Sequence, residues 1–200
     1  MTKLLVATFN KKKRAEIRSL LKTFKGIRVM NLEDIRLAPP MIIEDGKTFR
    51  ENAVKKALTM SRFFDGLVIA DDSGLEVEAL GGKPGVRSAR FSRKNATDEE
   101  NNAKLLSLLD NIPDEHRAAR FVCHIALAKQ GKLLDSFEGV VDGKVLSIPQ
   151  GANGFGYDPL FVPKKHEETF AEMSDDEKNK ISHRAMALKK LKKVIKKYLD

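Results

Sequence analysis

Two adjacent carboxylates, Asp71 and Asp72, are the residues of this sequence best suited to chemistry. They follow an apolar run over residues 67–70 and precede the pair Ser73-Gly74, so we expect a buried strand that carries both acids at its tip. Successive strand side chains point to opposite faces, and the two acids therefore cannot face one point. One carboxylate is expected to face a functional site, and the other is expected to support that site. For this motif alone, a solvated turn after a core strand is the alternative.

A third carboxylate, Glu44, lies in residues 39–46, which we expect to lead into a short strand closed by a turn. Thr48 and Glu51 follow with the spacing of a capping box, which predicts a helix through about Phe64. A carboxylate thus again lies beside a chain reversal.

The start of the chain predicts an anion site. An apolar strand over residues 3–8 runs into a helix for which Asn10 is a suitable N-cap. Free N–H groups at such a helix start bind anions, and its first turn is crowded with the cations Lys11, Lys12, Lys13 and Arg14. Cations at this end oppose the helix dipole, which argues for an anionic partner. A basic turn that faces solvent is the alternative.

Two later segments could contact a ligand. Residues 151–159 place glycines around Phe155 and Tyr157, a composition that lets backbone approach a flat ligand while a ring stacks on it. A turn held by aromatic anchors is the alternative. The donors of Ser182-His183-Arg184 open the terminal helix, where a surface cap would explain them equally well.

Composition indicates a soluble globular protein, with 42% hydrophobic and 32% charged residues. No apolar stretch approaches the roughly 20 residues of a membrane span, and no signal peptide is recognised, so we expect a cytoplasmic protein without a membrane partner. Cys123 lies in an apolar run and is expected to be buried rather than nucleophilic.

The net charge of +9 is concentrated in residues 183–200, where apolar spacing predicts an amphipathic helix with solvated lysines. We expect no specific nucleic-acid partner, although a nucleic-acid surface on this helix is the alternative.

The order of predicted elements is mixed α/β. Thr97 and Glu100 repeat the capping pattern before another helix, and the runs over residues 120–128 and 133–141 flank a predicted hairpin turn. Neither a repeat nor a low-complexity linker is present, so we expect one domain over residues 1–200.

Taken in order, these motifs resemble the inosine triphosphate pyrophosphatase family, also called the Ham1 or RdgB family of XTP/dITP diphosphatases. The resemblance spans nearly the whole chain, and its segments are Thr8-Phe9-Asn10-Lys11-Lys12-Lys13, residues 44–53, residues 70–75, Pro84-Gly85 with residues 88–91, residues 154–159 and Ser182-His183-Arg184. Each motif is weak alone, but their succession is specific. Arg87 departs from the pattern, because many relatives would carry an aromatic residue there.

The resemblance implies an elongated two-lobed α/β fold around a long central mixed sheet, with a nucleotide cleft between the lobes, and a homodimer. It implies that non-standard purine nucleoside triphosphates (ITP, dITP and XTP) are hydrolysed to nucleoside monophosphate and pyrophosphate, which clears them from the nucleotide pool. A Maf-type nucleotide pyrophosphatase is one alternative, with an Arg-rich loop expected in place of Thr8-Phe9-Asn10. A nucleic-acid-binding module that uses the terminal basic helix is the other.

The implied cofactor is Mg²⁺, which prefers oxygen ligands and retains several waters. Glu44 and Asp72 would hold it, and Asp72 would also orient or deprotonate the water that attacks the α-phosphorus, with Asp71 as support. Implied contacts to the triphosphate come from the opening motif and its surroundings, namely Thr8, Phe9, Asn10, Lys11, Lys12, Lys13, Lys56 and Ser73.

Base selection is implied for the later motifs. His183 and Arg184 would donate to the 6-keto oxygen of inosine or xanthine, whereas adenine would leave these donors unpaired. Phe155 would stack on the base, and close backbone over Phe155, Gly156, Tyr157 and Asp158 would exclude the 2-amino group of guanine. Lys178 resembles a substrate-binding lysine of the family, and Lys180 is the alternative for that role.

Overall fold

The computed structural model describes residues 1–35 and 40–199, and the chain divides into two compact units. Unit 1 consists of Met1–Asp72, Cys123–Gly139 and Arg184–Asp200, and unit 2 consists of Ser73–Val122 and Val140–His183. The predicted mixed α/β class is confirmed. None of the described helices is long and apolar enough to cross a membrane.

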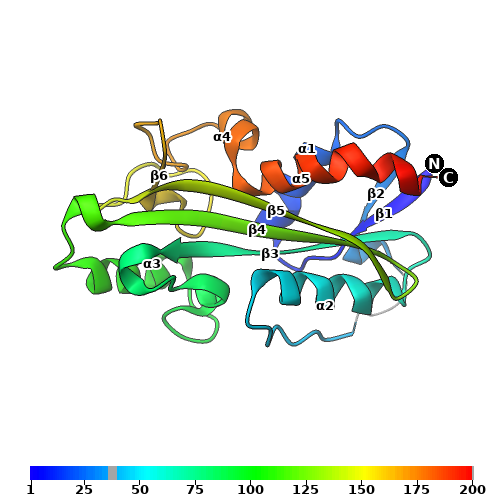
Figure 1. The fold of residues 1–200 in the computed structure, drawn as a ribbon, viewed down its shortest axis with the longest axis horizontal. Helices are drawn as coiled ribbons and strands as arrows, with labels where there is room; N and C mark the ends of the chain where they lie inside the picture. Colours follow the sequence, from blue (N-terminus) through cyan, green and yellow to red (C-terminus); the bar gives the residue numbers. More distant parts are fainter. Residues whose placement is uncertain (36–39, 200) are drawn as a thin grey trace. The chain divides into compact units, whose positions relative to one another are not determined.

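Unit 1 is built on parallel strands with helices on both faces. Strand β1 (Thr2–Val6) pairs in parallel with β2 (Ile27–Asn31) and with β3 (Leu67–Val77). Helices α1 (Lys11–Leu21) and α5 (His183–Val194) cover one face, and α2 (Phe49–Ser61) covers the other (Figure 1).

The side chains of β3 alternate between these two faces. Leu67 and Ile69 belong to the core that includes α1 and α5, whereas Val68 and Ala70 belong to the core under α2. The next two residues continue the alternation, which directs Asp71 and Asp72 to opposite faces as predicted.

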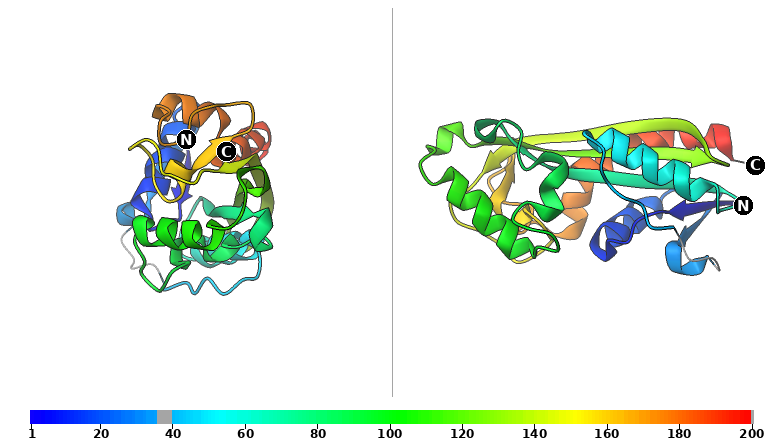
Figure 2. Two further views of the ribbon diagram at one scale, coloured as in Figure 1. Left: turned by 90° about the vertical axis from the view of Figure 1, so that its left-hand side faces the viewer. Right: turned by 90° about the horizontal axis from the view of Figure 1, so that it is seen from below.

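A long hairpin follows β3 in the sheet order β2-β1-β3-β4-β5-β6. Strands β4 (Ala118–Lys129) and β5 (Lys132–Val145) are neighbours in this sheet, as Figure 1 and the right view of Figure 2 show. Gln130 and Gly131 join them with φ of 50° and 74°, the left-handed backbone of a two-residue turn that matches strand twist. The predicted hairpin is confirmed. Because β5 pairs antiparallel with β6 (Phe161–Pro163), the sheet is mixed.

Unit 2 contains α3 (Asp98–Leu109) and α4 (Asp175–Ile181). Its core joins Leu105 and Leu109 of α3 to the aromatic rings of Phe121, Phe161 and Phe170. The capping box predicted for α3 is present, since Thr97 Oγ1 accepts from the Glu100 N–H and Glu100 Oε2 accepts from the Thr97 N–H. Short 3-10 turns connect the larger elements, at Leu32–Asp34, Glu78–Leu80, Gly85–Arg90, Asp114–His116, Asp158–Leu160 and Ile195–Tyr198.

The strand that carries the acidic pair does not end there. It continues through Ser73 and Gly74 to Val77, so the prediction of carboxylates at a strand tip was wrong. Gly74 serves close packing instead of a chain reversal, because a Cβ on this residue would lie 2.2 Å from Ser88 Oγ and 2.7 Å from the Gly85 carbonyl oxygen.

The strand predicted before Gly46 was also wrong. Residues 40–46 form neither helix nor strand, and the Pro39 part of this prediction lies outside the described residues. Met41 and Ile43 are 90% and 64% exposed, so this apolar run does not form a buried strand. Thr48 caps α2 as predicted, but Glu51 Oε2 accepts from the Lys47 N–H and not from Thr48.

Candidate functional site

Two carboxylates and one ammonium group meet on the α2 face of unit 1. Lys56 Nζ lies 3.2 Å from Glu44 Oε2 and 3.9 Å from Asp72 Oδ1. The other oxygen of Asp72, Oδ2, accepts a 2.9 Å hydrogen bond from Asn52 Nδ2. The residues predicted as metal ligands from separate segments are therefore gathered around a single cation.

Asp72 is a more basic carboxylate than an exposed one. Burial raises its pKa above the ordinary value, although the ammonium groups of Lys56 and Lys13 oppose the shift. A carboxylate whose pKa is moved toward neutrality is suited to accept a proton from water.

Asp71 has different partners on the opposite face. Its Oδ2 lies 3.3 Å from Lys13 Nζ and 3.5 Å from an Arg184 guanidinium nitrogen, and Arg184 also pairs with Glu16. Burial alone would raise the pKa of Asp71, but Lys13 and Arg184 together lower it below the usual range. Asp71 is therefore a buried anion that holds two cations in place.

Helix α1 begins as the sequence predicted. Asn10 Oδ1 accepts from the Lys13 N–H at 3.0 Å, and Thr8 Oγ1 accepts from the Asn10 N–H at 3.3 Å. The cations of the first turn then separate, because Lys13 reaches Asp71 while Arg14 pairs with Glu33. Three other members of the opening motif are exposed, namely Phe9, Lys11 and Lys12.

The donor set on the α2 face fits a hard divalent cation that is shared with a phosphate ligand. Across residues 1–35 and 40–199, no group of three or more His, Cys, Asp or Glu side chains is placed to hold a metal by itself. The two carboxylates around Lys56 Nζ nevertheless converge on a position that already accommodates positive charge. Mg²⁺ is commonly bound by one or two carboxylates that are completed by waters and substrate phosphates.

A second cluster of predicted residues lies within unit 2. Asp158 Oδ2 accepts from the Phe155 N–H at 2.7 Å and from Lys178 Nζ at 2.6 Å, and this ammonium lies 5.0 Å from the centre of the Phe155 ring. Gly154 has a φ of +74°, and a Cβ there would lie 2.1 Å from Asp158 Oδ2. Lys178 is buried and belongs to this cluster, whereas Lys180 is exposed.

The remaining residues of this loop are anchored by long-range hydrogen bonds. Tyr157 is buried and its hydroxyl donates to the Ser88 carbonyl at 2.9 Å, while the Gly156 carbonyl accepts from Asn102 Nδ2 at 3.0 Å. Tyr157 therefore acts as an aromatic anchor of this loop, which was the alternative to ligand stacking that the sequence offered.

The start of α5 contributes to both units. His183, in unit 2, stacks on Phe121 with ring centres 4.7 Å apart and an angle of 8° between the ring planes, whereas Arg184 belongs to the Asp71 cluster of unit 1.

Ser73, predicted as a substrate contact, is partly buried on β3 directly after Asp72. Cys123 is buried, and burial raises its thiol pKa to about 12, in agreement with a packing role.

Sequence reasoning missed two polar residues, Asn52 and Glu16. Asn52 is 1% exposed and joins Asp72 to the loop that carries Glu44. Glu16 pairs with Arg184, which lies far away in the chain. The one available signal for Asn52 was a polar residue beside Ala53 on the buried stripe of α2, because a buried amide requires hydrogen-bond partners.

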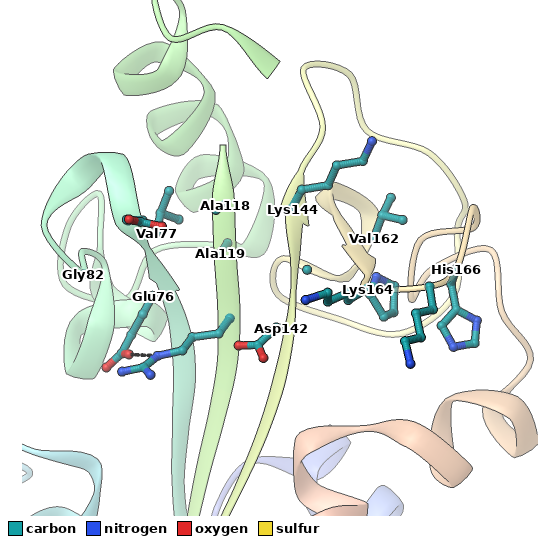
Figure 3. A pocket seen from close by; sticks show the side chains of 15 residues that line it. Glu76, Val77, Gly82, Ala118, Ala119, Asp142, Lys144, Val162, Lys164 and His166 are labelled. Carbon is teal, nitrogen blue, oxygen red and sulfur yellow. Dashed lines mark hydrogen bonds and ion pairs between the residues drawn. The ribbon is translucent and has the colours of Figure 1, made fainter. Parts of the chain in front are cut away.

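Unit 2 also has a hollow of about 780 Å³ over β3, β4 and β5 (Figure 3). Its walls carry charges of both signs, including an ion pair of 2.7 Å between Arg120 and Glu76, with Asp142, Lys144 and Lys164 nearby. The described residues that line it include none of those predicted as site residues. The predicted site residues therefore lie in the clusters described above and not around this hollow.

The fold and these clusters define a mixed α/β protein with grouped carboxylates and lysines, and comparison with known proteins gives its family. A model of the Ham1 family matches residues 4–194. A dITP/XTP pyrophosphatase from Shouchella clausii is 50% identical over 98% of this chain and 97% of its own, and one from Bacillus subtilis is 44% identical over 98% of both. The structure of a HAM1 protein from Coxiella burnetii is 40% identical, with a TM-score of 0.87 over 98% of this chain and 100% of that protein. The chain belongs to the Ham1 family.

Proposed function

We propose that this protein hydrolyses non-standard purine nucleoside triphosphates (dITP, XTP and ITP) to the nucleoside monophosphate and pyrophosphate. The observation that carries the proposal is the convergence of Glu44 and Asp72 on Lys56 Nζ, with an ion pair between Lys13 and the buried Asp71 on the opposite face of β3. The pyrophosphatase names of relatives that match along nearly their whole length support the same activity.

The proposed mechanism assigns a role to each charged group around β3. Asp72 orients the attacking water and accepts its proton, a role that the raised pKa of this carboxyl favours. Lys13 and the N–H groups at the start of α1 bind the phosphate chain and stabilise the departing pyrophosphate. Asp71 fixes the position of Lys13, and Lys56 neutralises the carboxylates before substrate binds.

Glu44 and Asp72 are the residues that would hold Mg²⁺. When bound, the ion would offset the charge of the triphosphate and help to position it.

The proposed activity is tested with a panel of nucleoside triphosphates in the presence of Mg²⁺, with pyrophosphate and orthophosphate measured separately. We expect ITP, dITP and XTP to be cleaved faster than ATP and GTP, with pyrophosphate as the inorganic product. Orthophosphate as the main product, or a preference for modified pyrimidine triphosphates, would reject the proposal.

Glu44→Gln is expected to lower activity at low Mg²⁺ and to recover part of it at high Mg²⁺. The substitution removes a charged oxygen ligand but leaves the proposed base, Asp72, intact. The measurement is pyrophosphate release as a function of Mg²⁺ concentration. Glu51→Gln is a suitable control, because its carboxylate binds the Lys47 N–H and neither Lys56 nor Asp72. A loss of activity that Mg²⁺ concentration does not change would contradict a ligand role for Glu44.

For the base, we propose that His183 and Arg184 read the 6-keto oxygen and that Phe155 stacks on the ring. Stacking on Phe121 fixes the orientation of His183. Glu16 and Asp71 likewise fix the Arg184 guanidinium, which becomes a preorganised donor. Asp158 and Lys178 hold the loop that carries Phe155.

Arg184→Ala is expected to lower the ratio of kcat/KM for ITP over ATP by about 10- to 100-fold, the effect of losing one charge-assisted hydrogen bond of roughly 1.5–3 kcal/mol. Loss of the contact to Asp71 slows both substrates, so the ratio and not either rate reports base reading. Lys13→Ala is the matched control, because a phosphate contact is common to all triphosphates and its loss should leave the ratio unchanged. If Arg184→Ala slows ITP and ATP equally, this residue serves Asp71 and the phosphates alone.

A further inference from the structure

The side chain of Asn52 forms hydrogen bonds to both carboxylate-bearing segments of the candidate site. Its Nδ2 donates to Asp72 Oδ2 at 2.9 Å, and its Oδ1 accepts from the Gly46 N–H at 2.8 Å. Gly46 lies two residues after Glu44, so a single side chain fixes the base and the loop that carries the second ligand.

The chemistry of the partners determines the orientation of this amide. A backbone N–H can only donate, and an ionised carboxylate can only accept. The carbonyl oxygen must therefore face Gly46 and the NH₂ group must face Asp72. Asn52 is buried on α2, and a buried amide with both ends bonded is held in one rotamer.

The Glu44 loop is held on α2 by Asn52 and by two further side chains of this helix, since Glu51 Oε2 accepts from the Lys47 N–H at 2.7 Å and Lys56 Nζ lies 3.2 Å from Glu44 Oε2. Residues 40–46 form no helix or strand. The Lys55–Asp45 ion pair that also holds the loop has side chains that are 43% and 64% exposed, and exposed pairs stabilise little. The loop also lies directly on the helix, since a Cβ on Gly46 would be 2.6 Å from Asn52 Oδ1 and 2.9 Å from Glu51 Cβ.

We propose that Asn52 is a positioning residue of the metal site, which sets the spacing of the Glu44 and Asp72 carboxylates without touching substrate or metal. This inference rests on the proposed function and adds a residue to it. In a site completed by substrate phosphates, ligand spacing decides affinity, and the loss of such a supporting partner typically weakens metal binding by about 10- to 100-fold.

The test compares Asn52→Leu with Asn101→Leu, because leucine has a similar shape and adds no charge. Asn101 is a matched control: it is a buried asparagine on α3 that accepts from the Ser92 N–H and donates to the Ala89 carbonyl, within unit 2. Mn²⁺ affinity is measured by electron paramagnetic resonance with a non-hydrolysable ITP analogue, and unfolding is followed by circular dichroism. We expect Asn52→Leu to weaken Mn²⁺ binding by about 10- to 100-fold and Asn101→Leu to leave it unchanged, with similar losses of stability.

Gly46→Ala tests the loop contact separately and keeps the Asn52 amide. We expect it to weaken Mn²⁺ binding by a smaller factor, because the bond from Asn52 to Asp72 remains. Wild-type Mn²⁺ affinity in either folded variant, or an equal loss in Asn101→Leu, would overturn the inference. Failure of the wild-type protein to release pyrophosphate would instead reject the proposed function, which keeps the two failures distinct.

Discussion

Asp72→Asn is expected to reduce pyrophosphate release by at least about 100-fold, and by up to about 10⁴-fold if general-base catalysis is lost completely. The amide has the shape of the carboxylate but lacks its charge, so it is a poor proton acceptor and a weak Mg²⁺ ligand. Folding should be retained, because the remaining carbonyl oxygen can still accept from Asn52 Nδ2. Steady-state hydrolysis of ITP, together with a circular dichroism spectrum, measures both expectations.

Asp65→Asn provides the control for this experiment. Asp65 is exposed just before β3, and we expect the same chemical change there to leave kcat/KM within about two-fold of wild type. Turnover near the wild-type rate by folded Asp72→Asn would remove Asp72 from the proposed mechanism.

Asp71→Asn should cause the largest loss of stability, about 3–5 kcal/mol at neutral pH. The carboxylate is buried and compensates the charges of Lys13 and Arg184, so its neutralisation leaves two cations without their common anion. Urea denaturation monitored by circular dichroism gives the free energy of unfolding. Activity should fall as well, because Lys13 is no longer held in place.

The pH dependence of stability identifies the source of this loss. The pKa of Asp71 is lower in the folded protein than in the unfolded chain, so its contribution is fully present above about pH 4 and is lost as the pH falls below that value. Wild-type stability should therefore decrease through this acid range more steeply than that of Asp71→Asn. Parallel pH profiles for the two proteins would contradict the assignment of Asp71 as a stabilising anion.

The sequence predicted the local features of the site well, because these depend on periodicity and capping. Strand alternation separated Asp71 from Asp72, and Asn10 and Thr48 marked the starts of the helices as expected. The turn at Gln130 and Gly131 was also predicted from its local composition.

Other features depended on contacts between distant segments. Gly74 was interpreted as a strand breaker, but its function is to admit Ser88, which a pattern within residues 71–75 does not reveal. Likewise, no local signal pairs Glu16 with Arg184 or the Tyr157 hydroxyl with the Ser88 carbonyl. The segment before Gly46 was predicted as a strand because a short apolar run followed by a turn does not reveal whether a partner strand is available.

The role of Asn52 was missed for a related reason. Asparagine within a helix is a weak structural signal, and its importance here comes from two partners at different places in the chain, Gly46 and Asp72. The proposed roles of Glu44, Asp72 and the base-reading residues remain predictions that the experiments above test.

The position of water attack tests the central claim most directly. Hydrolysis of ITP in H₂¹⁸O, followed by mass spectrometry of both products, shows which phosphorus receives the water oxygen. If the site activates water for attack on the α-phosphorus, the label will appear in inosine monophosphate and the pyrophosphate will remain unlabelled. Label in pyrophosphate, or in orthophosphate released from the γ-position, would contradict the proposed reaction.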